Sequence, residues 1–304
     1  MKTKNFLFAA LTLAALSAGL VSCDDAQNLK DQQYFYVTVV SSNEVMGTVK
    51  GEGNYPAGAK INIMATPNTG FYFQQWNDGN TDNPRTITVT GDATYTAIFY
   101  YCISGTANGH DYIDLGLPSG TKWAICNVGA TKPEEYGDYF AWGETEPKTT
   151  YNWSTYKWCN GNDNTQTKYN TSSEYGTVDN KTVLELADDA ARANWGGAGR
   201  MPTDAEWTEL RENCTWTWTS DYNGTSVAGR IVTSKINGNF IFLPATGVRY
   251  NDDLYDAGSY GDYRSSSLYT DNPNDAWSVV FHSDYVDMYD CGRYYGHSVR
   301  PVCE

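Results

Sequence analysis

Short runs of alternating apolar and polar residues between positions 34 and 100 constrain the fold more than any other feature of this chain. The runs YFYVTVV, KINIMAT, RTITVTG and TYTAIFY are rich in β-branched and aromatic residues, and clusters of Gly, Pro, Asn and Asp separate them. A period of two is typical of strands, whereas no helical period occurs here. Residues 34–100 are therefore predicted to form a small all-β domain.

This segment also carries a characteristic set of glycines, aromatics and a proline. They lie in GTVKGEGNYPAGAKINIMATPNTGFYFQQWNDGNTDNPRTITVTGDATYTAIF, and they are Gly47, Gly51, Gly58, Pro67, Gly70, Phe73, Trp76 and Phe99. In these positions the segment resembles the bacterial surface repeat related to the internalin B-repeat. The resemblance implies a β-grasp-like spacer that holds a distal domain off a membrane. Its WND motif is similar to a calcium-site signature of lectins, but Trp76 is predicted to pack in the core.

The first residues, MKTKNFLFAALTLAALSAGLVSC, place two lysines before an apolar run. This pattern predicts a secretion signal over residues 1–22, because the run is shorter than the roughly 20 residues of a membrane helix. The ending LVSC resembles a bacterial lipoprotein processing site, which implies lipidation of Cys23 and a linker over residues 23–33. Asp24-Asp25 resembles an export tag of Bacteroidetes surface lipoproteins. We expect an outer-membrane lipoprotein exposed at the cell surface; an ordinary signal peptide is the alternative.

The net charge of the chain limits the kinds of partner that it can bind. The formal net charge of −15 becomes −17 without residues 1–22, which carry two lysines and no acid. Such a chain repels phosphate backbones, so no nucleic-acid partner is expected.

Six cysteines follow Cys23, and in an oxidising compartment some are predicted to pair, with the connectivity left open. No Cys-x-x-Cys occurs and the three histidines are scattered, so no metal site and no cofactor are predicted, with calcium left open.

Residues 101–304 are predicted to form a second domain of the α+β class, with few helices and many loops. In RMPTDAEWTELRENC, Thr203 and Glu206 match a capping box, and Trp207, Leu210 and Cys214 fall on one helical face. A second helix is expected in VLELADDAARANWGG, where the two glycines end it.

Several blocks of this second domain occur in a recognisable order. They are HDYIDLGLPSGTKWAICNVGA, YGDYFAWGE, WGGAGRMPTDAEWTEL, YRSSSLYTDNPNDAW and SVRPVC. In these blocks the domain resembles the Fibrobacter succinogenes major paralogous domain. The resemblance implies a C-type-lectin-like fold within the formylglycine-generating enzyme superfamily, which also holds receptors diversified by retroelements.

An enzyme needs a nucleophile, a base or a metal in a plausible arrangement, and none is evident. Formylglycine-generating enzymes use a cysteine pair, but Cys291 lies outside any matching motif. For Cys303, at the end of SVRPVC, a structural disulfide is the simpler interpretation, with Cys126 as one candidate partner. His110 is interpreted as solvated or hydrogen-bonded. We predict no catalytic residues; a formylglycine-generating-type oxidase is the alternative, and a structural or adhesive surface protein is a second one.

The segment from Arg249 to Cys303 uses a restricted alphabet, with nine Asp and no Glu, Lys or Gln. Glu and Asp are nearly equivalent on an exposed loop, so physical chemistry alone does not explain the exclusion. Randomisation of the adenines in Asn codons would explain the exclusion, because the resulting codons encode Tyr, Asp, Ser, His and Gly but not Glu, Lys or Gln. The hypothesis is therefore a face diversified by a retroelement.

Within this segment, NDAWSVVFHSDYVDMYD has a period of two on both sides of Ser283-Asp284, which predicts a hairpin. The side chains predicted to point into the core are Trp277, Val279, Phe281, Val286 and Met288.

The opposite face and the flanking loops are predicted to bind an unknown protein or glycan, because Tyr and Ser supply adaptable contact surface. The predicted ligand-binding residues are Tyr255, Asp256, Tyr260, Asp262, Tyr263, Arg264, Ser278, Val280, His282, Tyr285, Asp287, Tyr289, Asp290, Gly292, Tyr294, Tyr295 and His297.

Overall fold

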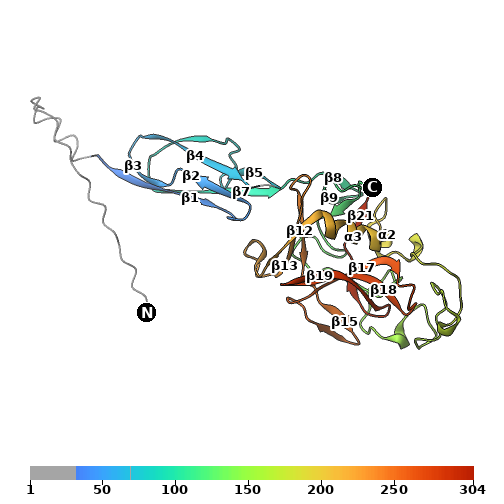
Figure 1. The fold of residues 1–304 in the computed structure, drawn as a ribbon. Helices are drawn as coiled ribbons and strands as arrows, with labels where there is room; N and C mark the ends of the chain where they lie inside the picture. Colours follow the sequence, from blue (N-terminus) through green and yellow to red (C-terminus); the bar gives the residue numbers. More distant parts are fainter. Residues whose placement is uncertain (1–31, 69) are drawn as a thin grey trace, which may run out of the picture.

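The computed structural model of the chain describes residues 32–68 and 70–304. The predicted signal segment over residues 1–22 and the predicted lipidation residue Cys23 lie outside these residues. In the described part, a slender domain of strands β1 to β7 leads into a larger head (Figure 1). None of the helices described is long and apolar enough to cross a membrane.

The slender domain consists of two small sheets that enclose one core. The first sheet has the strand order β3-β1-β7-β5, and the second has the order β2-β4-β6. Strands β1 and β7 run parallel, and the other pairs are antiparallel. The strands are β1 (Tyr34–Ser41), β2 (Gly47–Lys50), β3 (Gly53–Pro56), β4 (Lys60–Pro67), β5 (Phe71–Trp76), β6 (Arg85–Thr88) and β7 (Ala93–Tyr101).

Trp76 lies in the core of this domain. Its side chain is fully buried, its ring centroid is 5.3 Å from that of Phe73, and its indole N–H donates to the carbonyl of Asp82 at 2.9 Å. Asp78 of the WND motif forms a salt bridge with Arg85 at 2.7 Å. The prediction that Trp76 packs in the core is therefore confirmed.

A five-stranded sheet with the order β11-β20-β17-β18-β19 forms the centre of the head. Strand β17 is therefore central, and β19 lies at an edge. One face of the sheet packs Tyr263, Val279 and Phe281 against Trp207 and Leu210 of a helix. The strands are β11 (Tyr139–Phe140), β17 (Gly261–Leu268), β18 (Asp275–His282), β19 (Tyr285–Gly292) and β20 (His297–Ser298).

Three smaller sheets surround this central sheet, with the orders β12-β13-β14, β21-β10-β9-β8 and β15-β16. Their strands are β8 (Gly105–Ala107), β9 (His110–Asp114), β10 (Lys122–Ala124), β12 (Cys214–Thr219), β13 (Gly229–Ser234), β14 (Phe240–Pro244), β15 (Val248–Tyr250), β16 (Asp253–Tyr255) and β21 (Val302–Cys303).

The described residues hold two α-helices, α2 (Ala190–Trp195) and α3 (Asp204–Asn213). The predicted capping box of α3 is confirmed, since Thr203 Oγ1 accepts from the backbone N–H of Glu206 at 3.2 Å and its own N–H donates to the Glu206 carboxylate at 2.8 Å. Single 3₁₀ turns complete the helical residues: η1 (Trp153–Thr155), η2 (Ser173–Tyr175), η3 (Leu186–Asp188) and η4 (Tyr222–Gly224).

The predicted α+β class is wrong, because the described chain is largely all-β. The physical reason is the length of the helical segments. Helix α2 begins only at Ala190 and ends at Gly196, whose φ of 66° interrupts it. Only the segment after Thr203 combines a cap with ten residues free of Gly and Pro. Elsewhere, turn residues divide the head into runs long enough for short strands only.

Buried arginines organise the loops of the head from inside. Arg293 is fully buried and donates to the carbonyls of Lys168, Tyr169 and Pro273 at 2.9 to 3.0 Å. Arg300 is equally buried, and its partners are the carbonyls of Ala124, Ile125 and Phe242 and the side chain of Asn127. Backbone carbonyls of loops and of strand edges are satisfied in this way, as buried polar groups require.

The predicted disulfides do not occur in the described residues, where all six cysteines are free thiols. Cys126 and Cys303 are both buried but unpaired, so the suggested bond between them is not made. Burial raises the pKa of the Cys126 thiol to about 11, which keeps it protonated as a small apolar core residue.

Candidate functional site

The predicted C-terminal hairpin is confirmed. Strands β18 and β19 pair antiparallel with His282 opposite Tyr285, so Ser283 and Asp284 form the turn. Val279 and Phe281 are fully buried, and Val286 and Met288 pack against the same core. Trp277 differs from the prediction, because it is only partly buried and packs edge-on against Tyr269 at 4.9 Å.

The opposite face of the hairpin brings several predicted site residues together. Across the sheet, Asp262 is paired with Val280, and Val280 with Asp287. Next to this row, Arg264 is paired with Ser278, and Ser278 with Tyr289. Since side chains alternate along each strand, these residues share one face.

Six of the predicted ligand-binding residues are buried. They are Asp262, Tyr263, Arg264, Ser278, Gly292 and His297. Most of them belong to β17, β18 or β20, the inner strands of the sheet. Tyr263 points to the core side, and Arg264 donates to the carbonyls of Ala276, Cys291 and Gly292. These two side chains therefore support the face and do not form its surface.

The other predicted residues reach the surface to different degrees. Tyr255, Asp256, Tyr260, Tyr289 and Asp290 are exposed. Partly buried are Val280, His282, Tyr285, Asp287, Tyr294 and Tyr295.

Four of these side chains form a continuous strip across the hairpin, which we term the aromatic row: Tyr260, His282, Tyr285 and Tyr289. Neighbouring ring centroids are 5.1, 5.5 and 6.1 Å apart along it. Tyr260 and Tyr289, at its two ends, are 42% and 49% exposed. The row therefore presents adjoining aromatic surface to solvent.

Beside the row, a hollow of about 340 Å³ opens on the same side of the sheet. We term it the tyrosine pocket, and its lining residues are Val248, Tyr250, Tyr255, Asp256, Asp262, Cys291, Tyr295 and His297. The sequence prediction contained five of these eight residues. It missed Val248, Tyr250 and Cys291.

The small hairpin β15–β16 forms one wall of the tyrosine pocket. The backbone N–H of Arg249 donates to the carbonyl of Gly296 at 2.8 Å, and the reverse bond is 3.0 Å long. This pairing holds Tyr250 with its ring centroid 5.3 Å from that of Tyr295 and 6.2 Å from that of Tyr255. Tyr250 belongs to the same Tyr/Asp-rich segment, and this composition could have indicated it as a site residue. Its place in the pocket, however, depends on this non-local contact.

Three polar side chains lie at the base of the pocket. His297 Nδ1 is 2.5 Å from Asp262 Oδ1, and Cys291 Sγ is 3.9 Å from Asp262 Oδ2. Burial, followed by the positive charge of Arg264, lowers the pKa of His297, so its ring is neutral near pH 7. Burial also raises the pKa of the Cys291 thiol.

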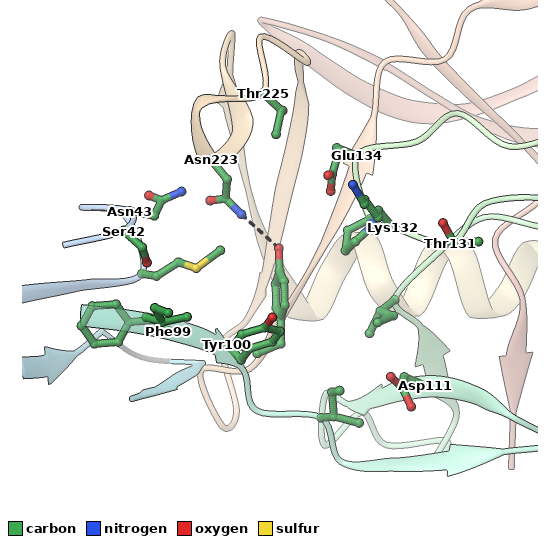
Figure 2. Close-up of a pocket in the computed structure, with 16 residues that line it drawn as sticks. Ser42, Asn43, Phe99, Tyr100, Asp111, Thr131, Lys132, Glu134, Asn223 and Thr225 are labelled. Carbon is green, nitrogen blue, oxygen red and sulfur yellow. Dashed lines mark hydrogen bonds between the residues drawn. The ribbon is translucent and has the colours of Figure 1, made fainter. Parts of the chain in front are cut away.

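A second hollow, of about 500 Å³, lies where the slender domain meets the head. Figure 2 shows its lining, with Phe99 and Tyr100 on one side and Lys132 and Glu134 on the other. The dashed line in Figure 2 is the hydrogen bond of 3.3 Å from Asn223 Nδ2 to the hydroxyl of Tyr101.

This junction also contains close aromatic packing. The ring centroid of Phe240 in the head is 4.8 Å from that of Phe71 and 5.6 Å from that of Tyr101. Gly70 has a φ of 83°, and a Cβ atom there would lie 2.6 Å from the Phe240 ring. A glycine is therefore required at this position.

With this geometry established, comparison with known proteins identifies the slender domain. Residues 37–102 match a family model described as a divergent InlB B-repeat domain. The predicted resemblance of the repeat is thereby confirmed. No curated protein and no solved structure gave a significant match.

Proposed function

We propose that this protein is a surface-exposed lipoprotein whose head binds a protein or glycan ligand through the aromatic row and the tyrosine pocket. The observation that supports this proposal most directly is that the aromatic row and the tyrosine pocket lie next to each other on one face of the head. The resemblance of the head to the Fibrobacter succinogenes major paralogous domain, with its lectin-like and retroelement-diversified relatives, is part of this proposal.

The chemistry of the face supports ligand binding. Tyrosines offer large, rigid contact area at low entropic cost and keep a hydroxyl for hydrogen bonding. Tyr255 at the rim of the pocket is 44% exposed, and the neighbouring Asp256 adds an exposed carboxylate. Aromatic surface grouped in this way is typical of an interaction site.

The order of the segments supports a role at the cell surface. The repeat lies between the proposed lipid anchor at Cys23 and the head, which begins near β8 (Figure 1). A repeat in this position separates the binding face from the membrane. The formal net charge of −15 favours ligands other than nucleic acids.

The proposal is tested by measuring the binding of the chain to immobilised probes. The wild-type chain and the triple variant Tyr260→Ala, Tyr285→Ala, Tyr289→Ala are applied to a glycan array and to a panel of purified surface proteins. We expect saturable binding of wild type to at least one probe and its loss in the triple variant.

A matched control removes exposed tyrosines from the repeat. The variant Tyr72→Ala, Tyr100→Ala changes side chains that are 44% and 48% exposed, and it should bind as wild type does. Equal binding by the triple variant, or equal loss in the control, would contradict the proposed site. The absence of any saturable probe would favour a purely structural or adhesive surface role.

A further inference from the structure

Three side chains from three strands converge at the base of the tyrosine pocket: Asp262 of β17, Cys291 of β19 and His297 of β20. Their ligand atoms all lie within 4.8 Å of one another. The described residues contain no second group of this kind. The strands of the central sheet hold all three, so the cluster is part of the rigid framework of the head.

The donor types match a zinc-class metal ion. Thiolate, imidazole and carboxylate are the ligands of Zn²⁺, whereas Ca²⁺ takes oxygen ligands only. Zinc bond lengths of about 2.0 to 2.3 Å place tetrahedral ligands about 3.3 to 3.6 Å apart. The distance of 3.9 Å between Cys291 Sγ and Asp262 Oδ2 is close to this range. A movement of a few tenths of an ångström would bring these two atoms into position.

The imidazole is held in place next to the carboxylate. His297 is fully buried, and its Nδ1 lies 2.5 Å from Asp262 Oδ1. Nδ1 would therefore be the ligand atom, and the ion would replace the proton between these two atoms. Nδ1 and Oδ1 would have to separate by about 0.8 Å to reach the spacing of tetrahedral zinc ligands.

The charges around the cluster are compatible with a cation. The guanidinium of Arg264 carries one positive charge nearby, but its hydrogen bonds go to backbone carbonyls. Asp262 and a Cys291 thiolate together carry two negative charges, which outweigh it. Binding of the ion would release the thiol proton, as thiolate coordination requires.

We propose that Asp262, Cys291 and His297 bind a zinc-class divalent ion at the base of the tyrosine pocket. Three protein ligands leave a fourth coordination position, and all three side chains line the tyrosine pocket. That position is open to water or to an oxygen atom of a bound molecule. The inference goes beyond the proposed function and does not depend on it, because the ion would bind whether or not the face has a ligand.

Cobalt titration tests this site directly, because thiolate coordination to Co²⁺ gives a charge-transfer band in the near ultraviolet. The chain carries Cys23→Ser and Cys102→Ser, so that the thiol outside the described residues and the exposed thiol do not contribute. We expect the band to saturate at one ion per chain and to be displaced by Zn²⁺. Addition of Cys291→Ser should abolish the band and weaken Zn²⁺ binding at least about 10-fold, the lower end of the range typical for changes to the hydrogen-bond partners of zinc ligands.

The variants Asp262→Asn and His297→Gln should also weaken Zn²⁺ binding, and Cys303→Ser is the matched control at a buried thiol outside the pocket. Circular dichroism shows whether each variant folds. Should a variant unfold, the thermal midpoint of the parent chain with Zn²⁺ or with a chelator provides a second measurement, since a bound ion raises it.

A flat titration, an unshifted midpoint or equal loss of the band in Cys303→Ser would overturn the proposal. The triple tyrosine variant of the aromatic row should retain the ion, which separates the failure of this site from the failure of ligand binding.

Discussion

The guanidinium of Arg230 donates to the carbonyl of His282 through Nε at 3.1 Å and through Nη2 at 2.6 Å. The same side chain also bonds the carbonyls of Ser283, Tyr285 and Trp216. One buried arginine of β13 therefore ties the tip of the β18–β19 hairpin to the neighbouring sheet.

Replacement of Arg230 should loosen this tip. Arg230→Ala leaves several carbonyls without their donor, and unsatisfied buried groups cost about 1 to 3 kcal/mol. We expect the free energy of unfolding to fall by that amount and amide exchange to rise at Ser283 to Tyr285. Arg230→Lys should also be destabilised, because an ammonium lacks the planar fork that donates to several carbonyls at once. Unchanged exchange at the tip in both variants would contradict this role.

Acid should destabilise the head through Glu206. Burial tends to raise the pKa of its carboxyl, but hydrogen bonds from Arg200, Thr203 and Thr121 outweigh burial and hold this pKa at about 2. The folded value lies below the unfolded value near 4.3, so the stabilisation is present above about pH 4.5 and is lost as the pH falls towards 2.

The loss amounts to at most about 3 kcal/mol, by the conversion of 1.36 kcal/mol per pKa unit. Denaturant unfolding between pH 6 and 2 measures it. Glu206→Gln should flatten the acid dependence, whereas Glu209→Gln on the same helix should leave it in place. A full acid dependence in Glu206→Gln would show that other carboxyls are responsible.

Phe240 should control the junction between the repeat and the head. It is 6% exposed, and its removal leaves a cavity beside Phe71 and Tyr101. We expect Phe240→Ala to lower stability by about 3 to 5 kcal/mol, as for other buried Phe→Ala changes. Small-angle scattering should also show a broader distribution of distances between the domains. Tyr72→Ala, at a position of the repeat that is 44% exposed, is the control, and an equal broadening there would refute the assignment.

The cysteines should behave as free thiols. Native alkylation followed by mass spectrometry should modify Cys102 first, because it is exposed, and leave buried Cys214 unmodified, since burial raises the pKa of its thiol to about 12. A reducing agent should leave the thermal midpoint unchanged. A midpoint that drops on reduction, with a matching disulfide-linked peptide, would contradict the structure.

Local features of the fold were predictable from the sequence, and non-local ones were not. The turn at Ser283-Asp284 and the cap at Thr203 each depend on neighbours within a few residues, so pattern reasoning located both. The burial of Asp262 and His297 depends on β17 and β20 lying side by side inside the sheet. No periodicity encodes that arrangement.

The same limit applies to the tyrosine pocket and to the fold class. Tyr250 lines the pocket because Arg249 pairs with Gly296, far along the chain. The α+β prediction gave two good helix signals too much weight, although the turn-rich remainder of the head forms many short strands. The part of the aromatic row on β19 was predictable, because Tyr285 and Tyr289 alternate with core residues.

The arginine bonds beneath the face have a consequence for how this protein can change. Arg230 and Arg264 reach the hairpin through carbonyl oxygens at His282, Tyr285 and Cys291, and every amino acid supplies such an oxygen. The anchoring is therefore indifferent to the identity of the residue it holds. Side chains can therefore be exchanged at exposed hairpin positions such as Tyr289 and Asp290 without loss of these backbone bonds, so the contact surface and its support are separable.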